Sequence, residues 1–172
     1  MSGVLVAAAP RGRLAFGLAV AFIVFVLDQL SKWWIVDVFD MPSRRMVEVT
    51  SFFNLVMVWN RGVSFGLFAN HAEVMPYVLA GVALAISAAL LVWLARVQRG
   101  WMAVAIGMVV GGAIGNVIDR FRFGAVADFL DFHAAGWHWP AFNIADTGIT
   151  VGVLMILVDG LFGGHDKDTD RR

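Results

Sequence analysis

Residues 111–152 read GGAIGNVIDRFRFGAVADFLDFHAAGWHWPAFNIADTGITVG, and this stretch decides the fold. It begins inside one apolar run and ends inside another, with polar residues packed between them. These are Asn116, Asp119, Arg120, Asp128, Asp131, Asn143 and Asp146. Ionisable groups at the edge of a bilayer are costly, so their presence here indicates a functional site. We interpret Asp128 and Asp146 as the reaction centre and the remaining chain as the scaffold that brings these carboxylates together.

The composition is that of a membrane protein. Of the 172 residues, 60% are hydrophobic and only 15% are charged, whereas a soluble domain carries about 25% charged residues. The apolar residues form long runs, which favours several membrane-spanning helices over one large core. The formal net charge is zero, so nothing indicates a nucleic-acid partner, and the absence of cysteine excludes disulfides and thiol catalysis.

The pattern predicts a mainly α membrane protein with four transmembrane helices and a small sheet on the membrane surface, formed by residues 1–172 as one polytopic domain. Val47–Thr50 alternates, and Phe52–Trp59 is rich in β-branched and aromatic residues, so short strands are predicted between the first two spans. No small-residue cleavage site follows the first apolar run, so we expect it to remain as a helix. The predicted spans are residues 14–36, 74–94, 101–118 and 144–161, and the β-rich segment is residues 37–73.

The predicted orientation places both termini in the cytoplasm. Lys and Arg number seven on the side of the termini and six on the other, when Lys32 is counted with the latter. The short turn Arg96–Arg99 is basic and contains no acid, so it decides the close count under the positive-inside rule. The two long loops, residues 37–73 and the segment between the third and fourth spans, are then expected on the outer side of the membrane.

Asp128 and Asp146 are 18 residues apart, the first in a predicted loop and the second near the start of the fourth span. Two carboxylates that share a proton can activate water, because the ionised one accepts a proton while the protonated one polarises a carbonyl. The alternative is that Asp146 is only an N-terminal helix residue and Asp128 a solvated loop acid. The spacing alone leaves both interpretations open.

Five motifs occur in order over nearly the whole chain. They are Asp28–Lys32 (DQLSK), Asn60–Gly66 (NRGVSFG), Gly112–Arg120 (GAIGNVIDR), Val126–Phe129 (VADF) and Phe142–Asp146 (FNIAD). Together they resemble the motifs of the bacterial lipoprotein signal peptidases, or signal peptidase II. The resemblance implies an aspartic endopeptidase of the bacterial inner membrane, with four helices and a periplasmic β-cradle. Such an enzyme removes the signal peptide of a prolipoprotein immediately before its diacylglyceryl-modified cysteine.

The resemblance also implies roles for individual residues. The catalytic aspartates match Asp128 and Asp146. Asp28 and Lys32, spaced i, i+4, are expected to neutralise each other, and Asp119 is expected to be structural, satisfied by Arg120 or water. The residues expected to support the site or bind substrate are Asn60, Arg61, Asn116, Arg120 and Asn143.

Asn116 and Arg120 share a helix face in this prediction and could hold the extended backbone of the substrate. The alternative for Arg120 is a purely structural pair with Asp119 or Asp131. The expected partners are diacylglyceryl-modified prolipoproteins and membrane lipids, with the protein a monomer and without a cofactor.

Other catalytic classes are less well supported. The histidines lack the spacing of a metal site, and the serines lack a partner base; these residues are His71, His133, His138, His165, Ser31, Ser64 and Ser87. Four phenylalanines are expected to face the membrane or fill the cradle, with a lipid-binding role open for some: Phe52, Phe53, Phe65 and Phe68.

The competing function is a small proton- or cation-coupled transporter, with Asp28, Asp128 and Asp146 along its path. Against it, no acid lies at the middle of a span and no internal repeat is visible. A purely structural membrane subunit would leave the ordered motifs unexplained.

Overall fold

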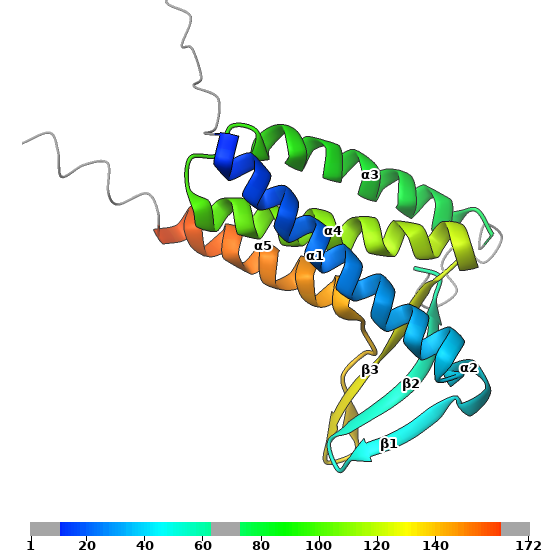
Figure 1. Ribbon diagram of the computed structural model, residues 1–172. Helices are drawn as coiled ribbons and strands as arrows, with labels where there is room; N and C mark the ends of the chain where they lie inside the picture. The colour runs from blue at the N-terminus through cyan, green and yellow to red at the C-terminus, as the bar shows by residue number, and fades with distance from the viewer. Residues whose placement is uncertain (1–10, 63–72, 163–172) are drawn as a thin grey trace, which may run out of the picture.

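A computed structural model describes residues 11–62 and 73–162. Its long helices lie side by side, and a small sheet extends from one end of them at a steep angle (Figure 1). Within the described ranges, four helical segments are long and apolar enough to cross a membrane. They are α1 (Arg11–Trp33) with its π-helical continuation η1 (Trp34–Val38), α3 (Met75–Leu94), α4 (Gly100–Phe123) and α5 (Ile144–Phe162). The predicted fold class, mainly helical with four membrane spans and a small sheet, is confirmed.

Helix α4 is the centre of the helical part. Within its most apolar window 72% of the residues are buried, against 17% in each of the other three spans. Glycines allow this close packing: a side chain at Gly111 would collide with the Ala21 carbonyl of α1, and one at Gly112 with the Ala145 carbonyl of α5. Backbones that approach so closely are typical of small-residue contacts between membrane helices. Because α4 carries Asn116 and Asp119, those two polar groups are buried within the helical part.

The sheet is antiparallel, with the strand order β1-β2-β3-β4. Strands β1 (Met46–Thr50) and β2 (Phe53–Asn60) lie where the alternating sequence predicts strands, and the short helix α2 (Met41–Arg44) precedes them. Strands β3 (Val126–Ala134) and β4 (Trp137–His138) come from the segment between the last two spans. The sheet therefore joins two parts of the chain that are distant in sequence.

The predicted loop position of Asp128 is wrong, because Asp128 lies on β3 opposite Val58 of β2. The first half of β3 is buried on both faces. A strand of that kind shows no alternation of polar and apolar residues, which is why its sequence did not indicate a strand.

Helix α4 extends beyond the predicted end at residue 118 and reaches Phe123, where Gly124 follows in the left-handed conformation with φ 67°. This is a common way to end a helix. The extra turn keeps Asp119 and Arg120 on the helix. Some predicted residues lie outside the described ranges. They are the part of the Asn60–Gly66 motif from Val63 onward, which includes Ser64 and Phe65, and also Phe68, His71 and His165.

Candidate active site

Asn143 fixes the position of Asp146 at the start of α5. The Asn143 side-chain oxygen accepts the Asp146 backbone N–H at 2.8 Å, and a carboxylate oxygen of Asp146 accepts the Asn143 N–H at 3.3 Å. These reciprocal bonds form a capping box, which satisfies backbone donors that the first turn of a helix cannot pair internally. The other carboxylate oxygen of Asp146 accepts the side-chain amide of Asn116 at 2.8 Å. Asp146 is thus held by both its own helix and α4.

The same Asn143 side chain also holds Asp128. Its Nδ2 donates to Asp128 Oδ1 at 2.7 Å, while Nδ2 of Asn60, the last residue of β2, donates to Asp128 Oδ2 at 3.0 Å. Asp128 is 1% exposed, and Asn143 is completely buried. One asparagine therefore bonds to both predicted catalytic aspartates and brings β3 and α5 together.

The environment of Asp128 favours its protonated form. Burial, the largest cause, raises the pKa of Asp128 to about 7, and the nearby charge of Asp146 acts in the same direction. The hydrogen bonds from Asn60 and Asn143 oppose this rise by stabilising the ionised form. Near neutral pH, Asp128 can therefore hold or release a proton, which a carboxyl group at its ordinary pKa cannot do.

A buried ion triad lies beneath these residues. Lys32 Nζ is 2.9 Å from Asp28 Oδ2 and 2.7 Å from Asp119 Oδ2. The expected Asp28–Lys32 pair is thus present, but it includes a second acid. The partner of Asp119 is Lys32 and not Arg120, because successive residues on a helix point in different directions and Asp119 faces α1.

The triad also binds the backbone beside each predicted catalytic residue. Asp28 Oδ1 accepts the Ala145 N–H at 2.9 Å, and Asp119 Oδ2 accepts the Ala127 N–H at 3.1 Å. Ala145 directly precedes Asp146, and Ala127 directly precedes Asp128. Lys32 therefore lies between two carboxylates that each hold one of the segments carrying the aspartates.

Asn116 connects the triad to the aspartate pair. Its side-chain oxygen accepts Lys32 Nζ at 3.1 Å and Asn143 Nδ2 at 3.2 Å, while its amide donates to Asp146. Gln29 adds hydrogen bonds to Asp28 at 3.1 Å and to Asp119 at 3.4 Å. Gln29 was not among the predicted site residues, although its position within the Asp28–Lys32 motif could have indicated a role in the site.

Arg120 keeps an unused hydrogen-bond donor. Its Nη1 donates to the Asn116 carbonyl at 3.1 Å, and its buried Nε has no partner in the part of the chain that the structure describes. The alternative partners considered from the sequence are engaged elsewhere: Asp119 with Lys32, and Asp131 with Asn54 at 3.0 Å and His138 at 2.9 Å. Arg120 is therefore not held by an ion pair with either acid.

Asp131 differs in environment from Asp128, three residues earlier on the same strand. Burial would raise the pKa of Asp131, but hydrogen bonds from His138 and Asn54 outweigh it and hold that pKa below its ordinary value. Asp131 is thus a stable anion that ties β2, β3 and β4 together. The sequence analysis did not anticipate its pairing with His138.

Arg61 lies apart from the aspartate pair. It is exposed and lines an open groove of about 530 Å³ with Glu73, Tyr77 and Phe123. Of the predicted supporting residues, the structure thus gathers Asn60, Asn116 and Asn143 on the aspartates and leaves Arg61 outside their hydrogen bonds. Among the described residues, no group of three or more His, Asp or Glu is arranged to hold a metal ion.

Fold and site together define a polytopic membrane protein with a buried acidic centre where its helices meet a small sheet. Residues 20–162 match the family model described as signal peptidase (SPase) II. The chain is 47% identical to the lipoprotein signal peptidase of Methylobacterium sp. (strain 4-46), with 92% of this chain and 96% of that protein covered. It is 44% identical to the lipoprotein signal peptidase of Paraburkholderia phytofirmans, with 89% and 88% covered.

Solved structures agree with this relationship. A bacterial membrane enzyme determined by the in meso method at 2.3 Å resolution superposes with a TM-score of 0.75 at 28% identity, covering 90% of this chain and 93% of that one. A second, at 1.9 Å resolution, gives a TM-score of 0.73 at 30% identity, covering 90% and 95%.

The chain belongs to the signal peptidase II family. It is accordingly a hydrolase of the protease class and a multi-pass protein of the bacterial inner membrane. The resemblance found in the ordered motifs is confirmed, and the protease is favoured over the transporter that the sequence analysis considered.

Proposed function

We propose that this protein cleaves prolipoproteins immediately before the diacylglyceryl-modified cysteine, and that Asp128 and Asp146 activate the attacking water. Family membership supports signal-peptide cleavage from prolipoproteins as the reaction. The observation that carries the assignment of the aspartates is the single Asn143 side chain bonded to both, at 2.7 Å to Asp128 and 2.8 Å to the Asp146 backbone.

The two carboxyl groups take different starting roles in this mechanism. Asp128, with its pKa near 7, begins protonated and donates a hydrogen bond to the scissile carbonyl oxygen. Asp146, in the first turn of α5, is the base that accepts the proton of the attacking water.

The proton transfers balance as follows. Water attacks the carbonyl carbon and gives a proton to Asp146, while Asp128 gives its proton to the carbonyl oxygen, which forms a tetrahedral diol. Asp146 then passes its proton to the nitrogen of the cysteine as the peptide bond breaks. Asp128 regains a proton from the diol, which becomes the new carboxyl group of the signal peptide.

Arg120 and Asn116 are proposed to bind the extended substrate backbone beside the pair. A signal peptide unwound from its helix presents carbonyl groups that need donors in a low-dielectric site. The unpaired, buried Nε of Arg120 is such a donor, and Asn116 already contacts Asp146. Arg61 and Asn60 are proposed to support the substrate from the side of β2, Asn60 through its bond to Asp128.

The proposed orientation places this site on the periplasmic side and both termini in the cytoplasm, with the protein acting as a monomer. The sheet lies at one end of the helices, and the basic turn 96–99 joins α3 to α4 at the other (Figure 1). Asp128 belongs to strand β3 of that sheet, and Asp146 lies in the first turn of α5.

The experiment is cleavage of a diacylglyceryl-modified precursor by purified protein in detergent, followed by mass spectrometry of the products. Asp128→Asn and Asp146→Asn should each lose nearly all activity, and the double variant should be little worse than either, because residues acting as a unit are not additive. Asp37→Asn is the matched control, since Asp37 forms only an exposed pair with Arg122. Substantial turnover by either single variant would contradict the proposed mechanism.

A further inference from the structure

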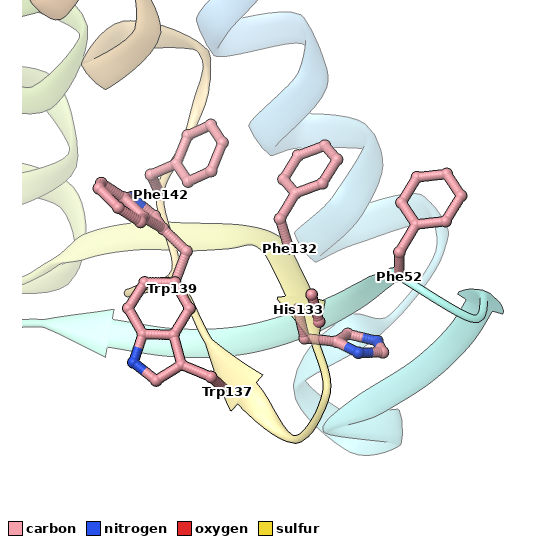
Figure 2. Close-up of a pocket in the computed structure, with 7 residues that line it drawn as sticks. Phe52, Phe132, His133, Trp137, Trp139 and Phe142 are labelled. Carbon is pink, nitrogen blue, oxygen red and sulfur yellow. The ribbon is translucent and has the colours of Figure 1, made fainter.

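An aromatic pocket lies at the outer part of the sheet, beyond the aspartate pair. Its volume is about 410 Å³, and the side chains that line it include Phe52, Phe132, His133, Trp137, Trp139 and Phe142. Figure 2 shows the rings of Phe52, Phe132 and Phe142 rising from the sheet in the same direction, toward the helices. None of the lining residues is an acid, a lysine or an arginine. The pocket is therefore suited to an uncharged, apolar ligand.

Most of the lining residues remain exposed in the folded chain. Phe52 is 56% exposed, Trp137 62% and Trp139 56%. Contiguous exposed aromatic surface on a protein marks a contact with a partner, a ligand or a membrane. In a protein whose spans end beside this sheet, such surface lies at the level where tryptophan meets the bilayer interface.

The aromatic pocket adjoins the site of the aspartates. A second pocket, of about 250 Å³, is lined by Asp146 together with Thr147, Thr150 and Val151 of α5, and it shares Trp139 and Phe142 with the aromatic pocket. The lining beside Asp146 and the aromatic surface of the sheet are therefore neighbours. A lipid that only anchored the protein would not require this connection.

The backbone holds the junction of the two pockets in place. Phe142 forms an antiparallel bridge with Leu130 of β3, with hydrogen bonds of 2.9 and 3.1 Å. Phe142 directly precedes Asn143, which bonds to both aspartates. The Phe132 and Phe142 rings stack at 6.0 Å, and the Trp137 and Trp139 rings meet edge to face at 5.7 Å. The position of the aromatic surface is therefore fixed relative to the reacting groups.

We infer that the aromatic pocket, reached past Trp139 and Phe142, binds an acyl chain of the lipid-modified cysteine of the substrate. This inference rests on the proposed function, in which the diacylglyceryl group is attached to the residue directly after the scissile bond. An apolar chain attached there needs apolar surface close to the reacting groups, and the aromatic pocket shares two of its walls, Trp139 and Phe142, with the pocket beside Asp146. An acyl chain bound in the aromatic pocket would hold the scissile bond against the aspartates. The pocket would thereby select lipid-modified substrates.

The test measures how cleavage depends on acyl-chain length. Synthetic lipopeptides with long, medium and short diacyl chains are presented in one neutral detergent, and kcat/KM is measured for the parent, for Trp137→Ala and for a Trp137→Ala, Trp139→Ala double variant. The parent should prefer long chains. The double variant should lose about tenfold in kcat/KM on the long-chain substrate, the loss expected for removing aromatic anchors from a contact. Its dependence on chain length should be flatter than that of the parent.

Trp101→Ala is the matched control, because Trp101 is an exposed tryptophan in the first turn of α4, at the opposite end of the helices. It should retain the chain-length dependence of the parent. Trp137→Ala keeps the test decisive if the double variant does not fold, because the Trp137 ring is 62% exposed and its packing contact is with Trp139.

If the tryptophan variants lose the same factor on all chain lengths, the aromatic surface contacts bulk lipid and the inference is wrong. The inference also fails if they lose nothing on any substrate. Absence of cleavage of every lipopeptide by the parent would instead overturn the proposed function, so the two failures are distinguishable.

Discussion

Replacing Lys32 with methionine should strongly destabilise the protein. Lys32 is 2% exposed, and its ammonium group lies within 3 Å of one oxygen each of Asp28 and Asp119, at 2.9 and 2.7 Å. Methionine has a similar length but no charge, so Lys32→Met leaves two buried carboxylates without their cation. Removing one partner of a buried ion pair costs about 3–5 kcal/mol. The loss of the hydrogen bond to Asn116 acts in the same direction.

The measurement is thermal unfolding of the purified variant in detergent, followed by circular dichroism. For a chain of this size each kcal/mol lowers Tm by about 2–4 °C, so the expected decrease is about 6–20 °C. Arg122→Met is the control. It breaks the ion pair of Arg122 with Asp37, in which the Arg122 side chain is 49% exposed and the Asp37 side chain 39%. Exposed pairs of this kind contribute about 0–1 kcal/mol to stability.

A second variant distinguishes the loss of charge balance from the loss of packing. Adding Asp119→Asn to Lys32→Met removes one of the two acids that have lost their cation. Part of the lost Tm should therefore return, although the contacts of Lys32 with Asp28 and Asp119 are both still missing. If Lys32→Met unfolds within about 2 °C of the parent, the loss of stability is under about 1 kcal/mol. The buried ion triad would then not stabilise the fold as predicted.

Three further predictions concern activity and orientation. The kcat/KM for the lipid-modified precursor should fall about tenfold per pH unit well above pH 7, because the raised pKa of Asp128, about 7, means that its proton is lost there; a profile flat to two units above that pKa would contradict the role of the proton. Arg120→Lys should lower cleavage at least about tenfold, corresponding to about 1.5–3 kcal/mol for a charged hydrogen bond, with Tm nearly unchanged; normal cleavage would refute substrate binding by the guanidinium. A reporter active only outside the cytoplasm should be active when fused after Gly136 and inactive after Gln98, and the reverse would overturn the orientation.

Parts of the fold were predictable where one local sequence signal dominates. Apolar runs of membrane length indicated the four spans, and alternation in Val47–Thr50 with the β-branched and aromatic residues of Phe52–Trp59 indicated the strands that are β1 and β2. Strand β3 was not predictable in the same way, because its first half is buried on both faces and Asp128 interrupts its apolar sequence. The end of α4 was placed too early for a related reason: Asp119 and Arg120 suggested solvent, whereas Asp119 is paired in the interior.

Several of the residues that the structure gathers around the two aspartates were predicted from the sequence, but their contacts were not. Ordered motifs identified both aspartates and the asparagines around them. Spacing could not indicate that Lys32 would reach Asp119 on another helix, 87 residues later, since only local i, i+4 pairs can be read from a sequence. The aromatic pocket likewise depends on the pairing of Leu130 with Phe142, which brings separate segments together only in the folded chain.

The most direct test of the paired carboxylates is an infrared titration of the purified protein, comparing the parent with Asp128→Asn. Because the pKa of Asp128 is raised to about 7, we expect a protonated carboxyl band in the parent that disappears as the pH rises through about 7. This band should be missing from Asp128→Asn. A difference spectrum without a protonated carboxyl band below pH 7 would mean that Asp128 is already ionised there. It would contradict the claim that this aspartate supplies the proton for cleavage.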